Sequence, residues 1–589
     1  MAAALSWLKT KLTPNFLEDP LPPPPVILRM MASSILLFMG TAFVLSVRAS
    51  VIASHARPLA VNGLSNSLHR RDDGKHILDG QVPITAFDRP VPNTYLNNKT
   101  KPYWVDGLAL PEVSFQIGET YSGLVPIDDT GRELFFWFVP STNALAKDEI
   151  TIWLNGGPGC SSLIGFFQEN GPVIWQPGTQ GPVPNTWAWN NLTNMVFIEQ
   201  PVGTGYSPGT PNITDEVGLA EQFLAFWKNY VDLFDLHDRK IYITGESYAG
   251  EYIPFISAAM LDKNDTQYFN LKGNLIYDPI LGDPDLSRQV TAGAFIKHHA
   301  PFFQFNDTFL AEIKNISEFC AFDTFREQAL TFPPTDNLPD YPPNWESPDC
   351  EIWEKIIDAA QIINPVFNIY RIADTGPILS TVMETPYDDV YVEGEVNLPY
   401  FDRSDVKKAL HVPDSTEWSE CSNIDVFATP LGAGDQSAPS ALEGGPLQQV
   451  IEATNNVIIA HGDLDYVLLA NGSLFALNNL TFNGQRGFSE PPVCPFYVPY
   501  HDEPFSGSVS GAGVQGGYVS ERGLTFIGVN QAGHEGPEYA PSASYRQLEF
   551  LLGRISSLQE VSGFTTQPDV EQSKGELGRG TWWPRDGGI

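Results

Sequence analysis

Residues 241–250 read Ile-Tyr-Ile-Thr-Gly-Glu-Ser-Tyr-Ala-Gly, and this stretch decides the fold. Its apolar, β-branched beginning is typical of a strand buried on both faces, and apolar residues at helical spacing follow at 252–261. On a tight strand-to-helix turn, Ser247 would project its hydroxyl group above the end of a parallel sheet. The usual pattern has a second glycine where this chain has Ala249, with Gly250 one residue later, so the stretch alone is also compatible with a serine in an ordinary turn.

The rest of the chain repeats this alternation of strand and helix. Helical spacing is found at residues 217–234 and 545–552. The runs 121–125 and 134–139 flank turn residues at 128–131 and predict an antiparallel hairpin at the leading edge of the sheet. Together these patterns predict a three-layer α/β fold with a mostly parallel central sheet. The other runs that read as buried strands are 150–154, 195–198, 275–277, 457–460 and 525–529.

One long segment interrupts the alternation. Residues 283–400 are rich in proline and aromatic residues and contain two cysteines, so a cap-like insertion into the core is the simplest interpretation. The chain is accordingly expected to have five parts. They are a targeting segment with a propeptide at 1–71, the first part of the core at 72–282, the insertion at 283–400, the second part of the core at 401–560 and a flexible tail at 561–589.

The N-terminal part has the pattern of a secretory signal. Arg29 precedes an apolar stretch at residues 30–47, and the small residues Ala49 and Ala53 follow. Because this stretch is marginal for spanning about 30 Å of hydrocarbon, a cleaved signal is favoured over an uncleaved signal anchor. The dibasic pair Arg70-Arg71 suggests that a propeptide is removed, although exposed arginine pairs are more often only solvated charges.

Glycosylation motifs agree with export. Eight Asn-x-Ser/Thr sequons follow the signal and favour the secretory pathway. We expect a secreted protein; the alternatives are the vacuole or a signal-anchored form, and the chain would meet a membrane only if the apolar segment stays uncleaved. The sequons are at Asn98, Asn191, Asn212, Asn264, Asn306, Asn315, Asn471 and Asn479.

The composition excludes several function classes. The formal net charge of −36 and the pI of about 4.5 disfavour nucleic acid and anionic membranes as partners. Five cysteines without a CxxC spacing argue against zinc, and an odd number leaves at least one free thiol if the other four pair. No His/Glu spacing suggests another metal site, so no metal is expected.

A nucleophilic serine needs a base to take its proton and an acid to orient that base. Asp463 and Asp465 follow the 457–460 run, and His534 follows the 525–529 run, which is the chain order Ser, Asp, His that such folds use. Each of these two segments, taken alone, could equally be an ordinary solvated loop without a catalytic role. Two suitable residue types after two suitable strands predict a catalytic triad, and spacing cannot choose between the two aspartates.

A loop that could stabilise an oxyanion follows the 150–154 run. Residues 155–162 read Asn-Gly-Gly-Pro-Gly-Cys-Ser-Ser, and glycines let a substrate approach the main chain closely. The N–H groups of Gly157 and Tyr248 are the candidate donors. A plain Gly/Pro turn is the alternative, and the position after the expected strand makes it the weaker one.

Five motifs, in their order along the chain, resemble those of the serine carboxypeptidases of the carboxypeptidase Y type. Within that family the chain is similar to the secreted fungal members. The resemblance extends from about residue 94 to residue 555. It implies an α/β-hydrolase fold with a cap-like insertion, and a serine-type carboxypeptidase that releases C-terminal residues from peptides and proteins through an acyl-enzyme, without a cofactor. The motifs are residues 153–162, 199–207, 245–250, 462–465 and 533–534.

The resemblance also implies roles for single residues. Ser247 is then the nucleophile, and His534 is the general base and afterwards the general acid. Asp465, rather than Asp463, is then the carboxylate that orients the histidine. The groups expected to bind the terminal carboxylate of the substrate are the Asn155 side chain, the Gly156 N–H, Glu169 and Glu246.

Glu169 and Glu246 lead to a prediction about pH. Two adjacent carboxyl groups cannot both ionise readily beside a substrate anion, so at least one keeps a proton and donates a hydrogen bond. Binding should weaken as pH rises and that proton is lost, which predicts an acidic optimum for peptide hydrolysis. The alternative is that both are ordinary surface acids.

The resemblance implies further features, and the chain departs from the family in two places. Cys160 should pair with Cys421 and Cys320 with Cys350, which leaves Cys494 free. Glu535 follows the catalytic histidine where some members have an apolar residue; it either lines the leaving-group pocket and favours a basic C-terminal residue or is an exposed loop acid. The family's glycine-rich stretch after the sixth strand is replaced here by residues 275–281, Leu-Ile-Tyr-Asp-Pro-Ile-Leu.

Three other functions remain as alternatives. An acyltransferase or an esterase would use the same chemistry, but the carboxylate-binding set favours a peptidase. A non-catalytic binding partner would not need a complete triad. A metallocarboxypeptidase would need a cluster of metal ligands that the sequence does not suggest.

Overall fold

The computed structural model describes residues 93–176, 179, 181–335, 338–342, 344–374, 399–502 and 510–572. The expected signal, the propeptide and the Arg70-Arg71 pair lie outside the described residues, as does the end of the chain after residue 572. Among the residues that are described, no helix combines the length and the apolar character needed to cross a membrane.

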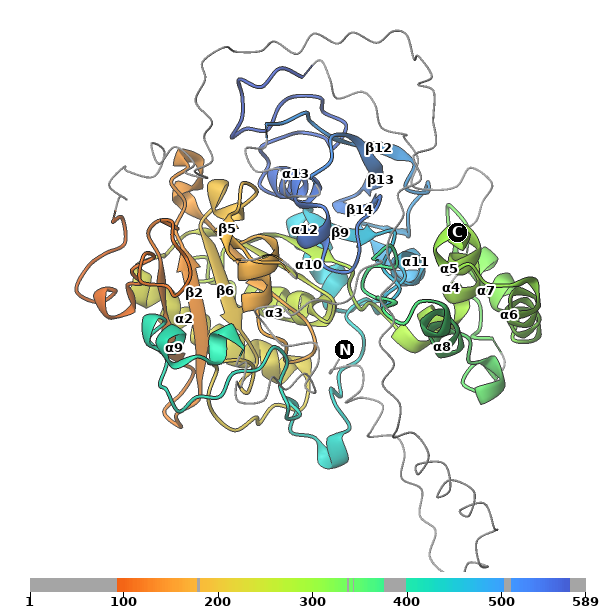
Figure 1. Cartoon of the computed structure of the whole chain (residues 1–589), viewed down its shortest axis with the longest axis horizontal. Helices are drawn as coiled ribbons and strands as arrows, with labels where there is room; N and C mark the ends of the chain where they lie inside the picture. Colours follow the sequence, from red (N-terminus) through yellow and green to blue (C-terminus); the bar gives the residue numbers. More distant parts are fainter. Residues whose placement is uncertain are drawn as a thin grey trace, which may run out of the picture. The chain divides into compact units, whose positions relative to one another are not determined.

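Every run that the sequence predicted as a strand lies in one ten-stranded sheet, with the order β1-β2-β6-β3-β7-β8-β9-β14-β13-β12 (Figure 1). The strands from β6 to β14 are parallel, and the hairpin β1–β2 forms one antiparallel edge, as predicted. The bounds are β1 (Tyr121–Pro126), β2 (Glu133–Val139), β3 (Glu149–Leu154), β6 (Met195–Glu199), β7 (Lys240–Glu246), β8 (Leu271–Tyr277), β9 (Val457–Gly462), β12 (Cys494–Val498), β13 (Gly513–Glu521) and β14 (Leu524–Val529).

The sheet separates two hydrophobic cores, and strand β2 shows why. Successive side chains of a strand point to opposite faces, so Phe136 and Phe138 lie in one core while Phe135 and Trp137 lie in the other. All four are fully buried, which accounts for the continuous apolar run in the sequence.

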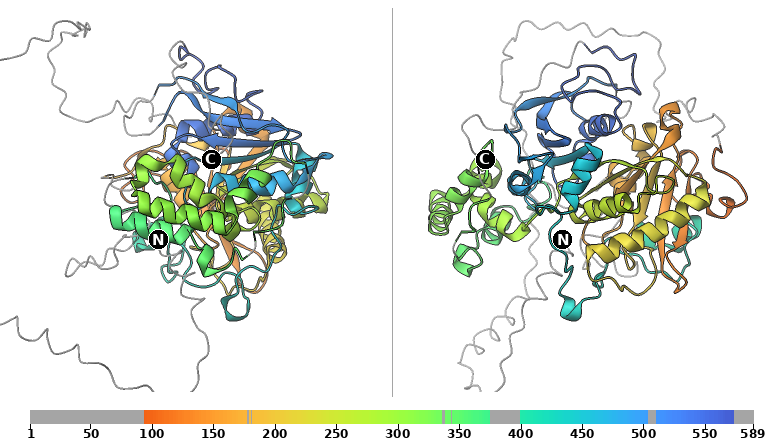
Figure 2. Two further views of the ribbon diagram at one scale, coloured as in Figure 1. Left: turned by 90° about the vertical axis from the view of Figure 1, so that its right-hand side faces the viewer. Right: turned by 180° about the vertical axis from the view of Figure 1, so that it is seen from behind.

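Helices cover both faces of the sheet. On one face lie α2 (Glu216–Phe234), α3 (Ala249–Lys263) and α10 (Pro446–Thr454), whose apolar residues join the first core (Figure 2, right). On the other face α13 (Pro541–Leu551) packs into the second core. Helix α2 begins where Asp215 accepts a hydrogen bond from Gly218 N at 2.8 Å, a regular N-cap.

The described part of the predicted insertion is helical and has a core of its own (Figure 1). Its helix α4 packs against α11 (Ala470–Asn479) of the main core, and a disulfide joins Cys320 to Cys350. Residues 375–398 lie outside the description. The helices of the insertion are α4 (Pro284–His298), α5 (Ala300–Phe303), α6 (Asp307–Phe319), α7 (Phe322–Ala329) and α8 (Trp353–Ile363).

Short elements complete the described chain. They are η2 (Lys101–Tyr103), η3 (Ala144–Asp148), the π-helical turn η4 (Gly165–Glu169), β4 (Val173–Ile174), β5 (Val183–Pro184), η5 (Trp189–Asn191), η6 (Pro348–Cys350), η7 (Tyr400–Asp402), α9 (Ser404–Ala409), η8 (Pro430–Gly432), β10 (Thr481–Phe482), β11 (Gln485–Arg486) and α12 (Gly536–Tyr539).

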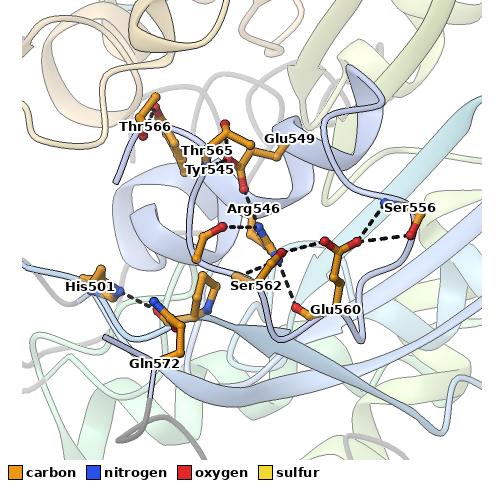
Figure 3. A network of polar contacts seen from close by, with 12 residues as sticks. His501, Tyr545, Arg546, Glu549, Ser556, Glu560, Ser562, Thr565, Thr566 and Gln572 are labelled. Carbon is orange, nitrogen blue, oxygen red and sulfur yellow. Dashed lines mark hydrogen bonds and ion pairs between the residues drawn. The ribbon is translucent and has the colours of Figure 1, made fainter. Parts of the chain in front are cut away.

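The expectation of a flexible tail from residue 561 is wrong for residues 561–572. Phe564 is only 1% exposed, and its ring packs against Trp187 and Tyr545 with centroids 4.9 and 5.6 Å apart. The fully buried Arg546 of α13 pairs with Glu549 at 2.7 Å and donates hydrogen bonds to the backbone of the following segment (Figure 3). A buried guanidinium needs such hydrogen-bond partners, and the backbone that supplies them is thereby held against the core.

Candidate active site

Ser247 lies directly after β7, on the turn into α3, with φ at +62°. A left-handed conformation is costly for a residue with a side chain, so the surroundings must hold it. Ser247 N donates to Tyr277 O at 2.9 Å, and Ile280 N donates to Ser247 O at 3.0 Å. The structure also explains why position 250 is a glycine: a Cβ there would lie 2.3 Å from Ile280 O. The predicted strand-to-helix turn is therefore present.

His534 and Asp465 are joined by a hydrogen bond of 2.8 Å between Nδ1 and Oδ2, and both are buried. Asp465 Oδ1 also accepts from the N–H groups of Val467 and Leu468, at 2.6 and 3.2 Å. Asp463 instead accepts from Gln531 N. The structure thus separates the two aspartates that spacing could not: only Asp465 contacts the imidazole.

The electrostatic surroundings of His534 act in opposite directions. Burial lowers the pKa of His534, but the adjacent Asp465 raises it, and the pKa ends above its usual value. Nδ1 faces Asp465, so Nε2 is the nitrogen left to accept a proton. The loops of Ser247, Asp465 and His534 all follow strands of one parallel run, β7, β9 and β14, and therefore leave the same edge of the sheet.

The loop after β3 lies against Ser247 and Tyr248. A Cβ on Gly156 would be 2.4 Å from Tyr248 N and 2.8 Å from Ser247 Cβ, so only glycine fits there. Gly157 has φ at +114°. The N–H of Tyr248 belongs to the turn that opens α3. The loop of Gly157 thus lies against the turn of Tyr248, and these two residues are the candidate oxyanion donors.

A disulfide between Cys160 and Cys421 holds this loop, as the resemblance implied. Two backbone hydrogen bonds of 2.8 Å support it, from Ser161 N to Glu420 O and from Ser422 N to Gly159 O. Cys494 is the free cysteine of the described chain and is half-buried.

Asn155, Glu169 and Glu246 form one buried cluster. Asn155 Nδ2 donates to Glu246 Oε1 at 2.7 Å and to Glu169 Oε1 at 3.2 Å. The Trp153 indole donates to Asn155 Oδ1 at 2.7 Å, which fixes the orientation of the amide because an indole N–H is only a donor. The two acids are 1% and 4% exposed, so the alternative that they are surface acids is wrong.

Burial favours the protonated form of these two carboxyl groups. Burial, followed by the charge of Glu535, raises the pKa of Glu169 to about 8. Burial, followed by the neighbouring Glu169 and Glu535, raises the pKa of Glu246 well above its usual value. The Oε2 atom of each acid is buried with no hydrogen-bond donor among the described residues, so both oxygens remain for a shared proton or for a ligand.

Glu535 lies close to this cluster and is half-buried, with Oε2 fully buried. A hydrogen bond from Tyr539 and the charge of His534 partly offset the effect of burial on its pKa, which stays raised. Of the two readings of Glu535, the exposed loop acid does not fit this burial.

Two neighbours of the site were not identified from the sequence. Tyr370, from the insertion, accepts a hydrogen bond from His534 N at 2.8 Å through its carbonyl oxygen, and its ring centroid lies 5.2 Å from that of His534. Glu538 follows four residues after His534, and burial raises its pKa well above the usual value. Helical spacing after the histidine was the only signal for Glu538, and no motif marks Tyr370.

One group of side chains has the atoms to hold a cation. Ligand atoms of Asp278, His461 and Asp465 lie within 4.8 Å of one another, and all three residues are buried. A cation at this place would compete with His534 for the Asp465 carboxylate, whose oxygens already accept three N–H groups. The donor set therefore fits a cation poorly.

The predicted glycosylation sites differ in their surroundings. Asn471 is only 4% exposed within α11, so the expectation of a glycan there is wrong, because an oligosaccharide has no room in the folded chain. Asn479 is half-buried. The exposed sequon residues are Asn98, Asn191, Asn212, Asn264, Asn306 and Asn315.

Comparison with known proteins places the geometry in context. A family model described as Serine carboxypeptidase matches residues 111–553. A probable serine carboxypeptidase of Arthroderma benhamiae is 48% identical over 478 residues, which cover 79% of this chain and 89% of that protein. Serine-type carboxypeptidase F of Aspergillus niger is 46% identical over 499 residues, which cover 82% of this chain and 91% of that protein.

Among solved structures, a prohormone-processing carboxypeptidase of Saccharomyces cerevisiae resembles this chain with a TM-score of 0.60 at 24% identity. The likeness covers 78% of this chain and 97% of that one. At this identity it concerns the fold, and it confirms the expected α/β-hydrolase fold.

Proposed function

Because the chain belongs to the serine carboxypeptidase family, and is thus a serine-type carboxypeptidase acting on peptides, we propose that it releases C-terminal residues through an acyl-enzyme on Ser247. The observation that carries the proposal is the contact of Asn155 with two buried acids, one of which directly precedes the triad serine. This contact supports a site for a chain-end anion beside Ser247, the proposed nucleophile.

The proposed chemistry starts from the hydrogen bond between His534 and Asp465. Nε2 of His534 takes the proton of the Ser247 hydroxyl as its oxygen attacks the scissile carbonyl carbon, and Asp465 stabilises the imidazolium that forms. The N–H groups of Gly157 and Tyr248 stabilise the oxyanion. His534 then protonates the leaving amine, and a water molecule, activated by the same imidazole, hydrolyses the ester.

Recognition of the terminal carboxylate is assigned to the Asn155 side chain, the Gly156 N–H, Glu169 and Glu246. A protonated carboxyl group can donate a hydrogen bond to the substrate anion, whereas an ionised one repels it. The raised pKa values of Glu169 and Glu246 support this role.

From this recognition mode we propose an acidic optimum for peptide hydrolysis. As pH rises and the pair loses its proton, the affinity for a chain-end anion falls. The raised pKa of His534 works against activity at low pH, because a protonated imidazole is no base. The acid limb of the kcat/KM profile should therefore report His534, and the alkaline limb the pair of glutamates.

Glu535 is assigned to the leaving-group pocket. It follows His534 directly, lies near the carboxylate-binding pair and is half-buried. A carboxylate there would favour a lysine or arginine at the C-terminus of the substrate, through an ion pair shielded from water.

A single set of substrates tests the proposal. A blocked dipeptide, its C-terminal amide and the corresponding ester are compared, with a fluorophosphonate and a chelator as inhibitors. We expect hydrolysis of the free acid, a much weaker reaction with the amide, covalent labelling at Ser247 and no effect of the chelator. Hydrolysis of the ester without hydrolysis of the free-acid peptide, or transfer to an alcohol, would instead indicate an esterase or an acyltransferase, and absence of labelling would indicate a non-catalytic role.

The cellular setting is also proposed. Two disulfides and six exposed sequon residues support export, with the vacuole as the alternative destination. The five-part division of the chain, with a removable segment at 1–71, stays part of this proposal. Mass spectrometry of the mature N-terminus tests it.

A further inference from the structure

Asp278 lies where the chain departs from the family pattern, directly after β8, with φ at +42°. Its segment contacts the loops of two triad residues. Tyr277 O accepts from Ser247 N at 2.9 Å, while Asp278 N donates to Ala460 O at 2.8 Å, on the strand that leads to Asp465. Asp278 itself is 0% exposed. The residue is thus placed between the nucleophile turn and the acid loop.

The two aspartates differ in their partners. Asp465 accepts three N–H groups, the number that stabilises an ionised carboxylate in a buried place. Asp278 receives one, from Gly462 N to Oδ1 at 2.9 Å, and its Oδ2 is buried without a donor among the described residues. Ligand oxygens of the two side chains lie within 4.8 Å. Two anions this close in a dry interior are unfavourable, so the one with fewer hydrogen-bond donors, Asp278, keeps its proton.

Every other titratable group near Asp278 is compatible with a protonated carboxyl group. His461 Nδ1 lies 3.2 Å from Asp278 Oδ1, and burial lowers the pKa of His461 to about 3, so it brings no positive charge. Glu535 also raises the pKa of Asp278 through its charge, after the larger effects of burial and Asp465. Tyr277 is neutral because burial raises its pKa. Burial, followed by Asp465, raises the pKa of Asp278 well above its usual value.

We propose that Asp278 is a positioning residue of the catalytic site: its protonated carboxyl group donates a hydrogen bond to the Asp465 carboxylate and so extends the triad to Ser247, His534, Asp465 and Asp278. The inference rests on the proposed function. The hydrogen bond from Asp278 would keep the Asp465 carboxylate in place while His534 gains and loses its proton. Asp278 does not touch the substrate, so its loss affects turnover rather than binding.

Two substitutions at one position test this assignment. Asp278→Asn keeps the shape and offers an amide N–H to Asp465, so we expect kcat within about threefold of the wild type. Asp278→Ala removes the donor, and we expect kcat to fall about 10- to 100-fold with KM nearly unchanged. Glu251→Ala is the matched control, since Glu251 is another buried acid with a raised pKa but contacts Ser440 instead of the triad. It should lower the melting temperature without lowering kcat.

A readout that needs no activity completes the experiment. The infrared difference spectrum of wild type minus Asp278→Asn should contain the carbonyl band of a protonated carboxyl group, shifted in D2O. An Asn variant as impaired as the Ala variant would mean that Asp278 acts as an anion, and an absent band would mean the same. An Ala variant with normal kcat and only a lower melting temperature would reduce Asp278 to a structural residue. A stoichiometric metal in the wild type, found by elemental analysis and lost in the Asn variant, would also overturn the proposal.

These outcomes can be distinguished from failure of the proposed function. If the proposed function is wrong, the wild type itself will neither release C-terminal residues nor be labelled by a fluorophosphonate. The infrared band would still report the protonation of Asp278. If the Ala variant does not fold, the Asn variant and its difference spectrum still decide.

Discussion

Nδ2 of Asn155 lies 2.7 Å from Oε1 of Glu246, the residue that directly precedes Ser247. A side chain from the loop after β3 is thereby tied to the nucleophile turn after β7. This contact fixes the side chains proposed to bind the chain-end anion relative to the turn that carries Ser247. Such a relation suits an exopeptidase, because the distance from the terminal carboxylate to the scissile bond is the same for every substrate.

The two aspartates of the 462–465 motif provide a matched pair. Asp465→Asn should lower kcat by about 10⁴-fold, because an amide beside Nδ1 favours the wrong imidazole tautomer. Asp463→Asn, two residues away, should retain activity within about tenfold, since Asp463 contacts Gln531 N rather than His534. Steady-state kinetics on one blocked dipeptide measures both. Equal losses would contradict the assignment of Asp465.

Glu246→Gln should raise KM for peptides by about tenfold or more and flatten the alkaline limb of the kcat/KM profile. A glutamine donates its N–H at every pH, so the affinity no longer depends on a titrating carboxyl group. The C-terminal amide of the same peptide is the control, because it has no anion to bind. If wild type and variant keep parallel profiles from pH 4 to 8, the glutamate pair does not control the pH dependence.

Glu535→Gln should change the preference of the enzyme for the C-terminal residue that it releases. Release of a C-terminal lysine should fall about tenfold relative to leucine, because the ion pair in a half-buried pocket is lost. Competition between the two peptides in one tube gives the ratio of kcat/KM values directly. An unchanged ratio would place the Glu535 carboxylate outside the leaving-group pocket.

The folded protein should be more stable in weak acid than at neutral pH. Burial raises the pKa of Glu199 to about 7 and that of Glu169 and Glu251 to about 8. A carboxyl group whose pKa is higher in the folded state binds a proton on folding, so its stabilising effect is complete below its unfolded pKa and is lost as pH rises through this range. Buried His299 and His461, with pKa values lowered to about 3, act oppositely below pH 6.5.

The expected maximum of stability is therefore near pH 5. The melting temperature measured by calorimetry should be at least about 5 °C higher at pH 5 than at pH 8. A constant ionic strength is required, because the net charge of −36 also changes with pH. A higher melting temperature at pH 8 would contradict the protonated state of the buried acids.

Glycan mapping tests the burial of the sequons. We expect modification at exposed sites such as Asn98 and Asn212 and none at Asn471, which is buried in α11. Peptide mass spectrometry after glycosidase treatment in heavy water compares all sites in one sample. A fully occupied Asn471 would mean that α11 does not pack as described here.

The sequence was sufficient for the main elements of the sheet. Continuous apolar runs such as 150–154 indicate strands buried on both faces, which is the usual situation in a parallel sheet, so these strands could be predicted directly. Strands β12 and β13 were not predicted, because the glycines of β13 and the proline of β12 obscure the pattern. The packed segment 561–572 was also missed, since its anchor, Arg546, lies on the preceding helix.

The sequence by itself determined the order of most strands and helices, the strand-to-helix turn of Ser247 and the residue types of the proposed triad, because these depend on local patterns and on chain order. Tertiary structure decided which aspartate contacts His534, that Tyr370 borders the imidazole and that Asp278 lies behind Asp465. The physical reason is that hydrogen bonds and pKa shifts depend on distance and burial. Neither can be read from spacing along the chain when the partners come from loops nearly two hundred residues apart, as Asp278 and Gly462 do.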